Sequence, residues 1–250
     1  MRGTDMAIDL SSFGDNITAV VFGAGGGIGS AFVRHLAAAG NVATVHAFSR
    51  RPAASSGKVR FTGCDITDEE QVSAAAKAID GPIQLCIIAT GILHDDDIAP
   101  EKSNSALDAT MMAEVLRINT IAPAIAARHF LPLLDRDRKS AIAALSARVG
   151  SIGDNRIGGW HSYRASKAAL NQVIRTMSIE LARKNRKALI VGLHPGTVDT
   201  GLSEPFQKNV PEGKLFSPDY STGEMLNVLN GLGPDDSGWC FDYAGQRIEP

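Results

Sequence analysis

Strand signals and helix signals alternate along nearly the whole chain of 250 residues. Short apolar runs rich in β-branched residues suit strands buried on both faces, and longer amphipathic segments suit helices. The predicted strands are residues 17–22, 42–48, 59–61, 83–89, 141–145, 188–193 and 239–241. The predicted helices lie near residues 30–39, 69–79, 107–134, 162–184 and 222–229. This alternation predicts an α/β fold in which one doubly wound parallel sheet of about seven strands carries helices on both faces and binds ligands at its carboxyl edge.

The chain is predicted to form a single domain over residues 16–250, because no repeat, linker or low-complexity tract divides it. Residues 1–15 are more polar and predict a mobile N-terminal extension. Residues 200–217 contain two prolines and two phenylalanines and predict a substrate flap, with a loop that has no gating role as the alternative. Thr67 and Glu70 predict a capping box for the second helix, and Pro123 and Pro132 are expected to interrupt or bound the third.

A glycine-rich turn separates the first predicted strand from the first predicted helix. Five of the seven residues from Gly23 to Gly29 are glycine. Without a Cβ, the backbone can turn tightly and approach a pyrophosphate, and the helix that follows offers unpaired N–H groups to the anion. Strand, turn and helix together predict a phosphate-binding loop, with a merely flexible loop as the alternative.

Tyr163 and Lys167 lie four residues apart in the fourth predicted helix, which brings their side chains onto one face. An ammonium near a phenol favours the phenolate and is expected to lower the tyrosine pKa from its ordinary value of about 10. A phenol that exchanges a proton near neutral pH suits the interconversion of carbonyl and alcohol. This spacing is common on solvated helices, so the pair indicates a catalytic site only together with the motifs around it.

Together these motifs resemble those of the short-chain dehydrogenase/reductase family, and the match runs along nearly the whole chain. Gly23, Gly27 and Gly29 fit the family's cofactor loop. The segment 194–200 is similar to the family's Pro-Gly segment beside the nicotinamide, and Asn119 looks like the helical asparagine that holds a proton-relay water. The stretches 146–163 and 238–248 narrow the resemblance to the C-factor-like and sniffer-like carbonyl reductases.

The resemblance implies a Rossmann-type fold and a site shared by cofactor and substrate. It implies catalytic roles for Tyr163, Lys167 and Asn119. It also implies that Tyr163, Lys167 and a set of residues at the strand ends contact the cofactor: Gly23, Gly25, Gly27, Ile28, Gly29, Asp65, Ile66, Ala89, Thr90, Gly91, Pro195, Gly196, Val198 and Thr200. The long helices around Asn119 and Tyr163 resemble the surfaces through which the family forms homodimers and homotetramers.

Two departures from the family pattern fall within the site. Ile88 and Ala89 stand where the family usually has asparagines. The position of the family's catalytic serine falls on Ala147, with Ser146 beside it. A shift of one residue turns a side chain to the other face of a strand, and a following loop about four residues longer than usual could absorb that shift. Ser146 is therefore the candidate serine and Ser151 the fallback, while Ser146 as a plain strand-end residue stays open.

The end of the second strand bears on cofactor choice. An acidic residue there would bind the ribose 2′-hydroxyl and repel a 2′-phosphate. This chain has Ser49, Arg50 and Arg51 instead, and a guanidinium suits a phosphate. NADP(H) is therefore predicted as the preferred cofactor, with NAD(H) possible and two solvated arginines as the alternative.

The composition excludes several classes of protein. A net charge of −2 gives no electrostatic case for nucleic acid or anionic membrane, and no secretory signal or membrane span is found, so the expected location is the cytoplasm. The three cysteines are odd in number and widely spaced, which predicts core residues in a reducing compartment. Asp95–Asp97 after His94 predict a solvated loop, so no metal is expected.

The sequence thus predicts an NADP(H)-dependent oxidoreductase that reduces a small ketone or aldehyde, with Tyr163 as general acid and base. Two alternatives remain: a non-catalytic dinucleotide-binding sensor on the same fold, supported by Ala147, and an NAD-dependent alcohol dehydrogenase. The substrate, the physiological direction of the reaction and the order of the homo-oligomer stay open.

Overall fold

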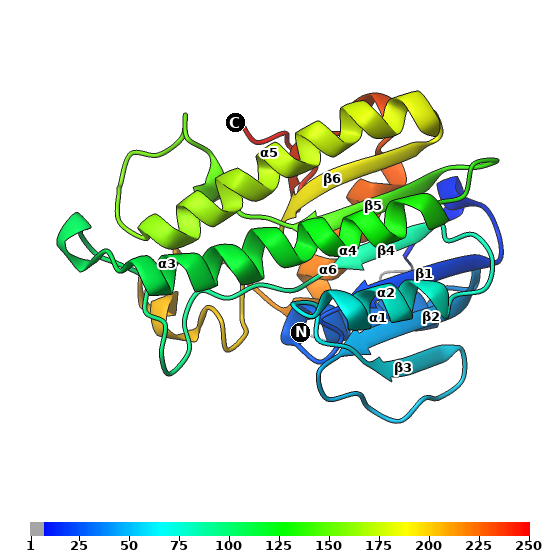
Figure 1. The fold of residues 1–250 in the computed structure, drawn as a ribbon, viewed down its shortest axis with the longest axis horizontal. Coiled ribbons are helices and arrows are strands. Elements are labelled where there is room, and N and C mark those ends of the chain that lie inside the picture. Colours follow the sequence, from blue (N-terminus) through cyan, green and yellow to red (C-terminus); the bar gives the residue numbers. More distant parts are fainter. Residues whose placement is uncertain (1–7) are drawn as a thin grey trace.

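The computed structural model describes residues 8–250 and contains a central sheet of seven parallel strands (Figure 1). The strands are β1 Ile17–Phe22, β2 Val42–Ser49, β3 Val59–Gly63, β4 Leu85–Ile88, β5 Ser140–Leu145, β6 Ala188–His194 and β9 Cys240–Asp242. Their order across the sheet is β3-β2-β1-β4-β5-β6-β9. The chain winds outward from β1 in both directions, so the Rossmann-type doubly wound fold is confirmed and each predicted strand is present within two residues.

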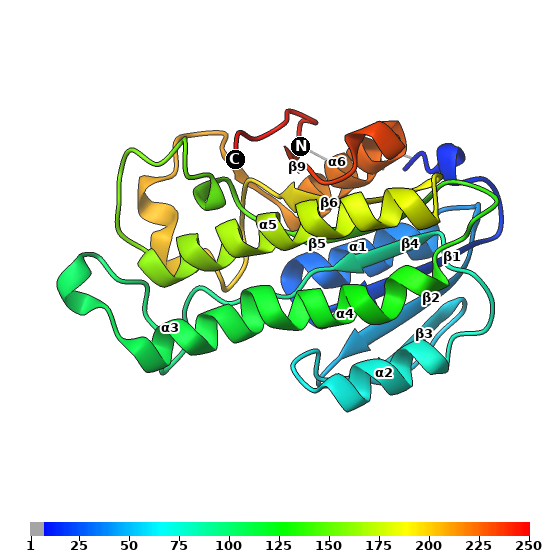
Figure 2. The same ribbon diagram turned by 45° about the horizontal axis from the view of Figure 1, so that its top comes forward.

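Residues 8–250 form six α-helices that flank this sheet or extend past its edge (Figures 1 and 2). They are α1 Gly27–Ala38, α2 Glu69–Lys77, α3 Ala109–Leu116, α4 Ala122–Phe130, α5 His161–Lys184 and α6 Pro218–Gly231. One apolar layer joins α1 and α6 to the sheet, and a second layer joins α2, α4 and α5 to the opposite face. Short 3-10 helices span Ser11–Phe13, Asn104–Ala106, Leu131–Leu133, Arg148–Gly150, Glu204–Asn209 and Pro234–Asp236.

The two layers follow from the alternation of side chains along β1. Ala19 and Val21 belong to the layer under α1 and α6, whereas Val20 and Phe22 belong to the layer under α4 and α5. The Phe22 ring lies 5.0 Å from that of Phe48 and meets the Phe130 ring edge to face at 5.1 Å. Burying one such side chain contributes about 1.5–3 kcal/mol, which makes this sheet a rigid base for its carboxyl edge.

The long third helix of the sequence prediction is present, but its hydrogen-bond pattern changes partway. A π-helical turn, Arg117–Ile121, joins α3 to α4, and Pro123 sits in the first turn of α4. The wider π turn places Asn119 fully inside the protein, with no exposed surface. Pro132 lies in the 3-10 turn that follows α4 and ends the helical stretch, as expected.

The capping prediction for the second helix is wrong. Asp68, not Thr67, is the N-cap residue of α2, and its carboxylate accepts hydrogen bonds from the backbone N–H groups of Glu70 and Gln71. Thr67 donates instead to the carboxylate of Asp65, from its N–H at 2.9 Å and from its hydroxyl at 2.7 Å. An aspartate caps a helix as well as a threonine does, so the helix start moves by one residue.

The predicted polar N-terminal extension needs correction over residues 8–15, while residues 1–7 lie outside the described residues. Leu10 and Phe13 are buried in the layer beneath α6. Asn230 of α6 accepts a hydrogen bond from the Ser12 N–H and donates one to Asp9. Two large apolar side chains in an otherwise polar stretch therefore anchor this segment to the domain.

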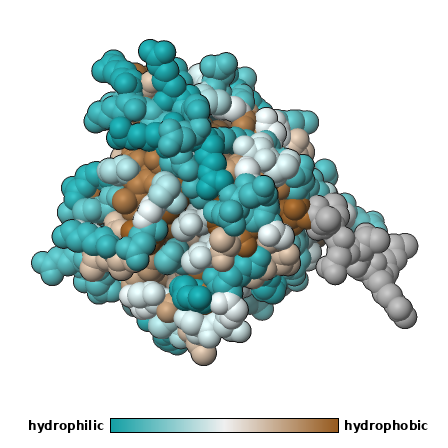
Figure 3. Space-filling model, turned by 90° about the vertical axis from the view of Figure 1, so that its right-hand side faces the viewer, coloured by the Kyte–Doolittle hydropathy of each residue, from teal (hydrophilic) through white to brown (hydrophobic). Residues whose placement is uncertain are grey.

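Most of the irregular structure gathers at the carboxyl edge of the sheet. The segment 200–217 carries a 3-10 helix, and a two-stranded ladder joins β7 Thr197–Val198 to β8 Leu215–Phe216. The opposite end of the molecule shows mainly hydrophilic side chains with scattered hydrophobic ones (Figure 3). Over residues 8–250, none of the helices combines the length and the apolar character that a membrane span requires.

Candidate functional site

The glycine turn between β1 and α1 is packed so closely that its glycines have no room for side chains. A Cβ on Gly29 would lie 2.0 Å from the carbonyl oxygen of Gly23, and one on Gly27 would lie 2.6 Å from Thr200. Gly23 has a φ of +77° and touches the backbone of Ala89. α1 begins at Gly27 with Gly26 as its N-cap residue, so no side chain caps it. The turn therefore presents free backbone N–H groups and a positive helix end to an anion.

The strand ends beside this turn carry further residues that the sequence predicts to contact the cofactor. A Cβ on Gly25 would lie 3.5 Å from the side chain of Ser49 at the end of β2, and the exposed Arg50 follows directly. The hydrogen bond from the Thr67 backbone, aided by the nearby charge of Arg50, holds the pKa of Asp65 below its usual value. The hydroxyl of Thr90, after β4, is buried without a hydrogen-bond partner in the protein. A buried donor of this kind is expected to find a partner in a ligand.

Tyr163 and Lys167 lie on one face of α5, as predicted, with the Lys167 Nζ atom 5.8 Å from the centre of the Tyr163 ring. Nζ donates a hydrogen bond of 2.8 Å to the carbonyl of Leu145 at the end of β5. Gly150 permits this approach, because a Cβ there would lie 2.8 Å from the Lys167 Cβ atom. The ammonium is thus fixed at the carboxyl edge of the sheet.

The expected lowering of the Tyr163 pKa is not observed. Burial raises the pKa of the half-buried Tyr163 to about 12, and burial lowers the pKa of Lys167 to about 8. The sequence argument counted the attraction between the two groups but not the loss of water around each, and this loss of hydration is the larger effect here. Lys167 still carries its proton at neutral pH.

Asn119 connects this pair to the strand-end loop after β4. Its amide accepts a hydrogen bond from the Ile92 N–H and donates one to the Ile92 carbonyl, both at 2.8 Å, and it also donates to the hydroxyl of Ser166. A Cβ on Gly91 would lie 3.4 Å from both Asn119 Oδ1 and Lys167 Nζ. The two side chains therefore converge on Gly91, at the carboxyl edge of β4.

Ser146, the serine predicted for the site, has its hydroxyl bonded to another residue of the protein. Ser146 is buried, and its hydroxyl donates a hydrogen bond of 2.6 Å to Oδ1 of Asn171, two helical turns and roughly 12 Å beyond Tyr163 on α5. The fallback, Ser151, is also buried, and its hydroxyl accepts from Asp154 and donates to the carbonyl of Pro250. Ala147 occupies the family's serine position, so the geometry does not support the catalytic role predicted for Ser146.

The Pro-Gly segment after β6 closes the other side of the site. Gly196 has a φ of +76°, and a Cβ there would lie 2.7 Å from the ring of Phe216. The hydroxyl of Ser221 donates to the carbonyl of Pro195 at 2.7 Å, which ties the segment to α6. The remaining predicted contacts, Ile28, Ile66 and Val198, are half-buried or buried beside the same edge. Thr200 packs against the glycine turn at Gly27, so the segment after β6 adjoins that turn.

Aromatic rings connect Tyr163 to the 200–217 segment. Trp160 packs edge to face on Tyr163 at 6.2 Å and on Phe206 at 5.0 Å. His94 packs on Phe206 at 5.7 Å, and its Nε2 atom lies 3.0 Å from the carbonyl oxygen of Gly201. The segment therefore rests on the residue that begins the Tyr163 helix.

Sequence reasoning missed two residues of this region. Asn171 continues the spacing of four residues from Tyr163 and Lys167, and that periodicity could have revealed it. Glu101 lies in the loop between β4 and α3, where no motif marks it, yet it is buried and bonded to the start of α5. Over residues 8–250, no group of three or more His, Cys, Asp or Glu side chains is arranged to hold a metal ion.

A parallel sheet with a glycine turn at its central strand and a tyrosine–lysine pair beside it defines a Rossmann-type protein with a dehydrogenase-like site. The family model for short chain dehydrogenases matches residues 17–211. The chain therefore belongs to the short-chain dehydrogenase family of oxidoreductases.

Two curated relatives illustrate the breadth of the family. C-signal of Myxococcus xanthus is 36% identical over 57% of this chain and 80% of its own length. The 1-hydroxy-2-glutathionyl-2-methyl-3-butene dehydrogenase of Rhodococcus sp. (strain AD45) is 31% identical over 88% of this chain and 94% of its own.

Two solved structures share the fold. The NADPH-bound carbonyl reductase from chicken fatty liver has a TM-score of 0.82 at 29% identity, covering 94% of this chain and 100% of its own. Carbonyl reductase Sniffer of D. melanogaster has a TM-score of 0.81 with the same coverage, and its identity of 21% supports the fold alone. C-signal, at 36% identity, confirms the resemblance to the C-factor-like branch, and the two carbonyl reductases share the fold of this chain.

Proposed function

We propose that the protein is an NADP(H)-dependent oxidoreductase that reduces a small ketone or aldehyde to an alcohol. The observation that carries this proposal is the convergence of Lys167 Nζ and Asn119 Oδ1 on Gly91, with Tyr163 one helical turn from Lys167. A phenol, an ammonium and a polar helical amide then lie together at the edge where the glycine turn would hold a dinucleotide.

Each of these residues has a separate task in the proposed reaction. When bound, the nicotinamide cofactor supplies the hydride. Tyr163, which its raised pKa keeps protonated at neutral pH, donates its proton to the carbonyl oxygen as the hydride arrives. Lys167, protonated at neutral pH, stabilises the phenolate that remains and returns a proton to it through the polar contacts around Asn119.

The preference for NADP(H) rests on the end of β2. A side chain at Gly25 would contact Ser49, and the exposed Arg50 follows Ser49 directly, so a 2′-phosphate could be bound there by a guanidinium. One charge-assisted bond contributes about 1.5–3 kcal/mol, or roughly tenfold to a hundredfold in affinity. The NADPH bound to the chicken carbonyl reductase supports the same choice.

One observation favours a second candidate, a dinucleotide-binding sensor without catalysis. Ala147 supplies no hydroxyl to a substrate oxygen, and Ser146 and Ser151 are held elsewhere. The loss of one such donor commonly costs about a hundredfold or more in rate. A site of this kind would bind the cofactor and turn over slowly.

We also propose a homodimer or homotetramer. Ile121 and Ile179, on the long helical stretches that contain Asn119 and Tyr163, are 54% and 47% exposed, as a partner-covered face would be. The three cysteines are buried and free, which supports a reducing compartment such as the cytoplasm. Light scattering on a sizing column tests the assembly, and a monomer at micromolar concentration contradicts it.

The deciding experiment is a binding comparison of NADPH and NADH, followed by a carbonyl panel on the same sample. We expect tighter binding of NADPH and its oxidation with at least one activated carbonyl. Tyr163→Phe is the matched variant, because it removes only the hydroxyl, and it should lose turnover by about a hundredfold or more while NADPH affinity stays within about twofold. Equal rates in the two proteins would remove Tyr163 from the mechanism, and binding without any turnover would favour the sensor.

A further inference from the structure

The helix that carries Tyr163 is capped by a residue from another part of the chain. Asp68, Asp108 and Ser217 cap α2, α3 and α6 with their own side chains. The N-cap residue of α5 is Trp160, whose side chain makes no capping hydrogen bond. The open N–H group at the start of α5 points instead to Glu101, some sixty residues earlier in the sequence.

Glu101 binds the start of α5 through both its side chain and its backbone. Its carboxylate accepts from the Ser162 N–H at 3.1 and 3.3 Å and also from the Ser162 hydroxyl. Its backbone carbonyl accepts from the Trp160 N–H. Glu101 is only 2% exposed, so each of these bonds lies out of competition with water. A carboxylate at a helix N-terminus is also favoured by the helix dipole.

The turn before α5 is shaped for this contact. Gly158, Gly159 and Trp160 have φ values of 71°, 65° and 52°, three consecutive left-handed residues. A left-handed conformation is unfavourable for a tryptophan, because its Cβ atom crowds the following carbonyl oxygen. It brings the backbone of Gly159 so close that a Cβ there would lie 3.3 Å from the Glu101 carbonyl oxygen. The strained turn and the buried carboxylate thus fix the first residues of α5 together.

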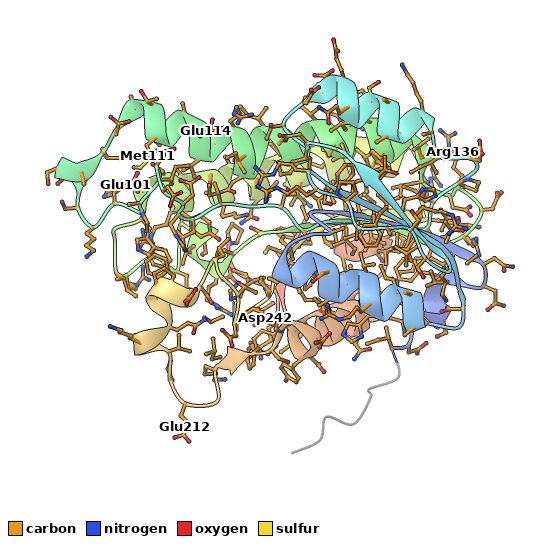
Figure 4. The ribbon with its side chains drawn as sticks, turned by 90° about the horizontal axis from the view of Figure 1, so that it is seen from below. Glu101, Met111, Glu114, Arg136, Glu212 and Asp242 are labelled. Atoms are coloured by element: carbon orange, nitrogen blue, oxygen red, sulfur yellow. The ribbon has the colours of Figure 1, made fainter. Side chains whose placement is uncertain are left out.

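Tyr163 is the residue immediately after Ser162, and Glu101, Ser162 and Tyr163 line one small cavity together with Met111 of α3. Figure 4 shows Glu101 and Met111 near each other at the end of the molecule that carries α3. A change in the hold on Ser162 therefore acts on the backbone that carries the phenol, and a displacement of about 1 Å at a reacting group can cost roughly a hundredfold in rate.

We propose that Glu101 is a positioning residue for Tyr163: by capping α5 from the loop between β4 and α3, it sets where the phenol stands. The proposal rests on the proposed role of Tyr163 as proton donor. Burial alone would raise the pKa of Glu101, but the hydrogen bonds from Ser162 outweigh burial and hold its pKa below the usual value. The cap is therefore charged at neutral pH.

The test uses Glu101→Gln, which keeps the shape but removes the charge, with Glu70→Gln as the control. Glu70 is a glutamate in the first turn of α2, so it too lies at a helix start, but it is exposed and remote from Tyr163. Amide hydrogen exchange of residues 160–166 should become about tenfold faster in Glu101→Gln, the loss expected for a helix cap, and stay unchanged in Glu70→Gln. Unchanged exchange in Glu101→Gln would overturn the proposal.

A double-mutant cycle with Tyr163→Phe separates positioning from a general loss of structure. Glu101→Gln should lower kcat about tenfold to a hundredfold with NADPH affinity within about twofold. In the Tyr163→Phe background it should have no further effect on single-turnover hydride transfer, and an equal loss in both backgrounds would refute positioning. If Glu101→Gln fails to fold, Ser162→Ala, which removes one of the bonds, should show a smaller effect of the same kind.

The two proposals fail in distinguishable ways. The exchange measurement needs no substrate, so faster exchange in Glu101→Gln without any carbonyl turnover by the unmodified protein would overturn the proposed function and retain the cap. Carbonyl turnover with unchanged exchange in Glu101→Gln would retain the proposed function and overturn the cap.

Discussion

The hydroxyl of Ser146 donates a hydrogen bond of 2.6 Å to the side-chain oxygen of Asn171. Ser146 is the hydroxyl-bearing neighbour of Ala147 in the sequence, and this bond directs it along α5, past Lys167 and away from Tyr163. Asn171 follows Lys167 by one helical turn, so Ser146 extends the row of polar residues on α5 instead of facing a substrate. In the proposed reaction, Tyr163 is therefore the hydroxyl that donates to the substrate.

Restoring the missing hydroxyl should speed the reaction. Ala147→Ser places a donor at the family's serine position, and we expect kcat for a simple ketone to rise by about tenfold, because a donor aimed at the substrate oxygen stabilises developing negative charge. Ser146→Ala is the matched control and should change kcat by less than about twofold. Steady-state kinetics on both variants checks this, and a large loss in Ser146→Ala would reinstate Ser146 as the catalytic serine.

Removing the guanidinium at the end of β2 should weaken one cofactor selectively. Arg50→Ala is expected to weaken NADPH binding by roughly tenfold to a hundredfold and to leave NADH binding within about twofold, because only NADPH carries the 2′-phosphate. Titration calorimetry with both cofactors measures this. An equal loss for both would mean that Arg50 acts on a shared part of the dinucleotide.

The glycine turn should tolerate no side chain at its tightest position. Gly29→Ala would put a Cβ 2.0 Å from the Gly23 carbonyl oxygen, so the turn must open, at a cost of about 1–3 kcal/mol in the free energy of unfolding and with loss of cofactor affinity. Gly40→Ala, where the new Cβ meets nothing within 4 Å, is the control and should be nearly neutral. Urea unfolding of the two variants decides, and equal stability would show that the turn adapts without cost.

The buried lysine predicts a pH-dependent stability. The pKa of Lys167 is lowered to about 8, so above pH 8 the unfolded chain binds a proton at this lysine that the folded protein has begun to release. Stability from this group therefore rises with pH up to the unfolded pKa of about 10.4. Between pH 7.5 and 9.5, the free energy of unfolding measured in urea should rise by about 2 kcal/mol more in the unmodified protein than in Lys167→Met.

The comparison with Lys167→Met is needed because other buried groups act in the opposite direction. Burial raises the pKa of Tyr163 and Cys240 to about 12 and that of Cys64 to about 11, which lowers stability as the pH rises above about 9. These groups are present in both proteins, so the difference between the two curves reports on Lys167. A constant difference across this range would contradict the lowered pKa.

The strands and the placement of the cofactor turn followed from local patterns in the sequence. The hydrophobic period, the apolar runs and the glycine content are all properties of residues that are close in the sequence. β1, for example, begins and ends where its apolar run does. The pair Tyr163 and Lys167 was found for the same reason, since its spacing lies within one helix.

What the sequence could not supply depended on contacts between distant segments. The pKa of Tyr163 is set by burial, which a spacing does not reveal. Leu10 and Phe13 looked like part of a polar tail, because their partners on α6 come more than two hundred residues later. The partner of Ser146 and the cap supplied by Glu101 are likewise visible only once α5 has packed on the strand ends.

The left-handed residues Gly158, Gly159 and Trp160 make the starting position of α5 independent of the length of the loop before it. Because a right-handed helix cannot propagate backward through such residues, α5 has one permitted starting point, and residues added before Gly158 lengthen the loop without advancing the helix. The extra residues between Ala147 and Tyr163 therefore leave the register of the tyrosine unchanged. Variation in this loop can accordingly change its own length and shape while Tyr163 stays in place.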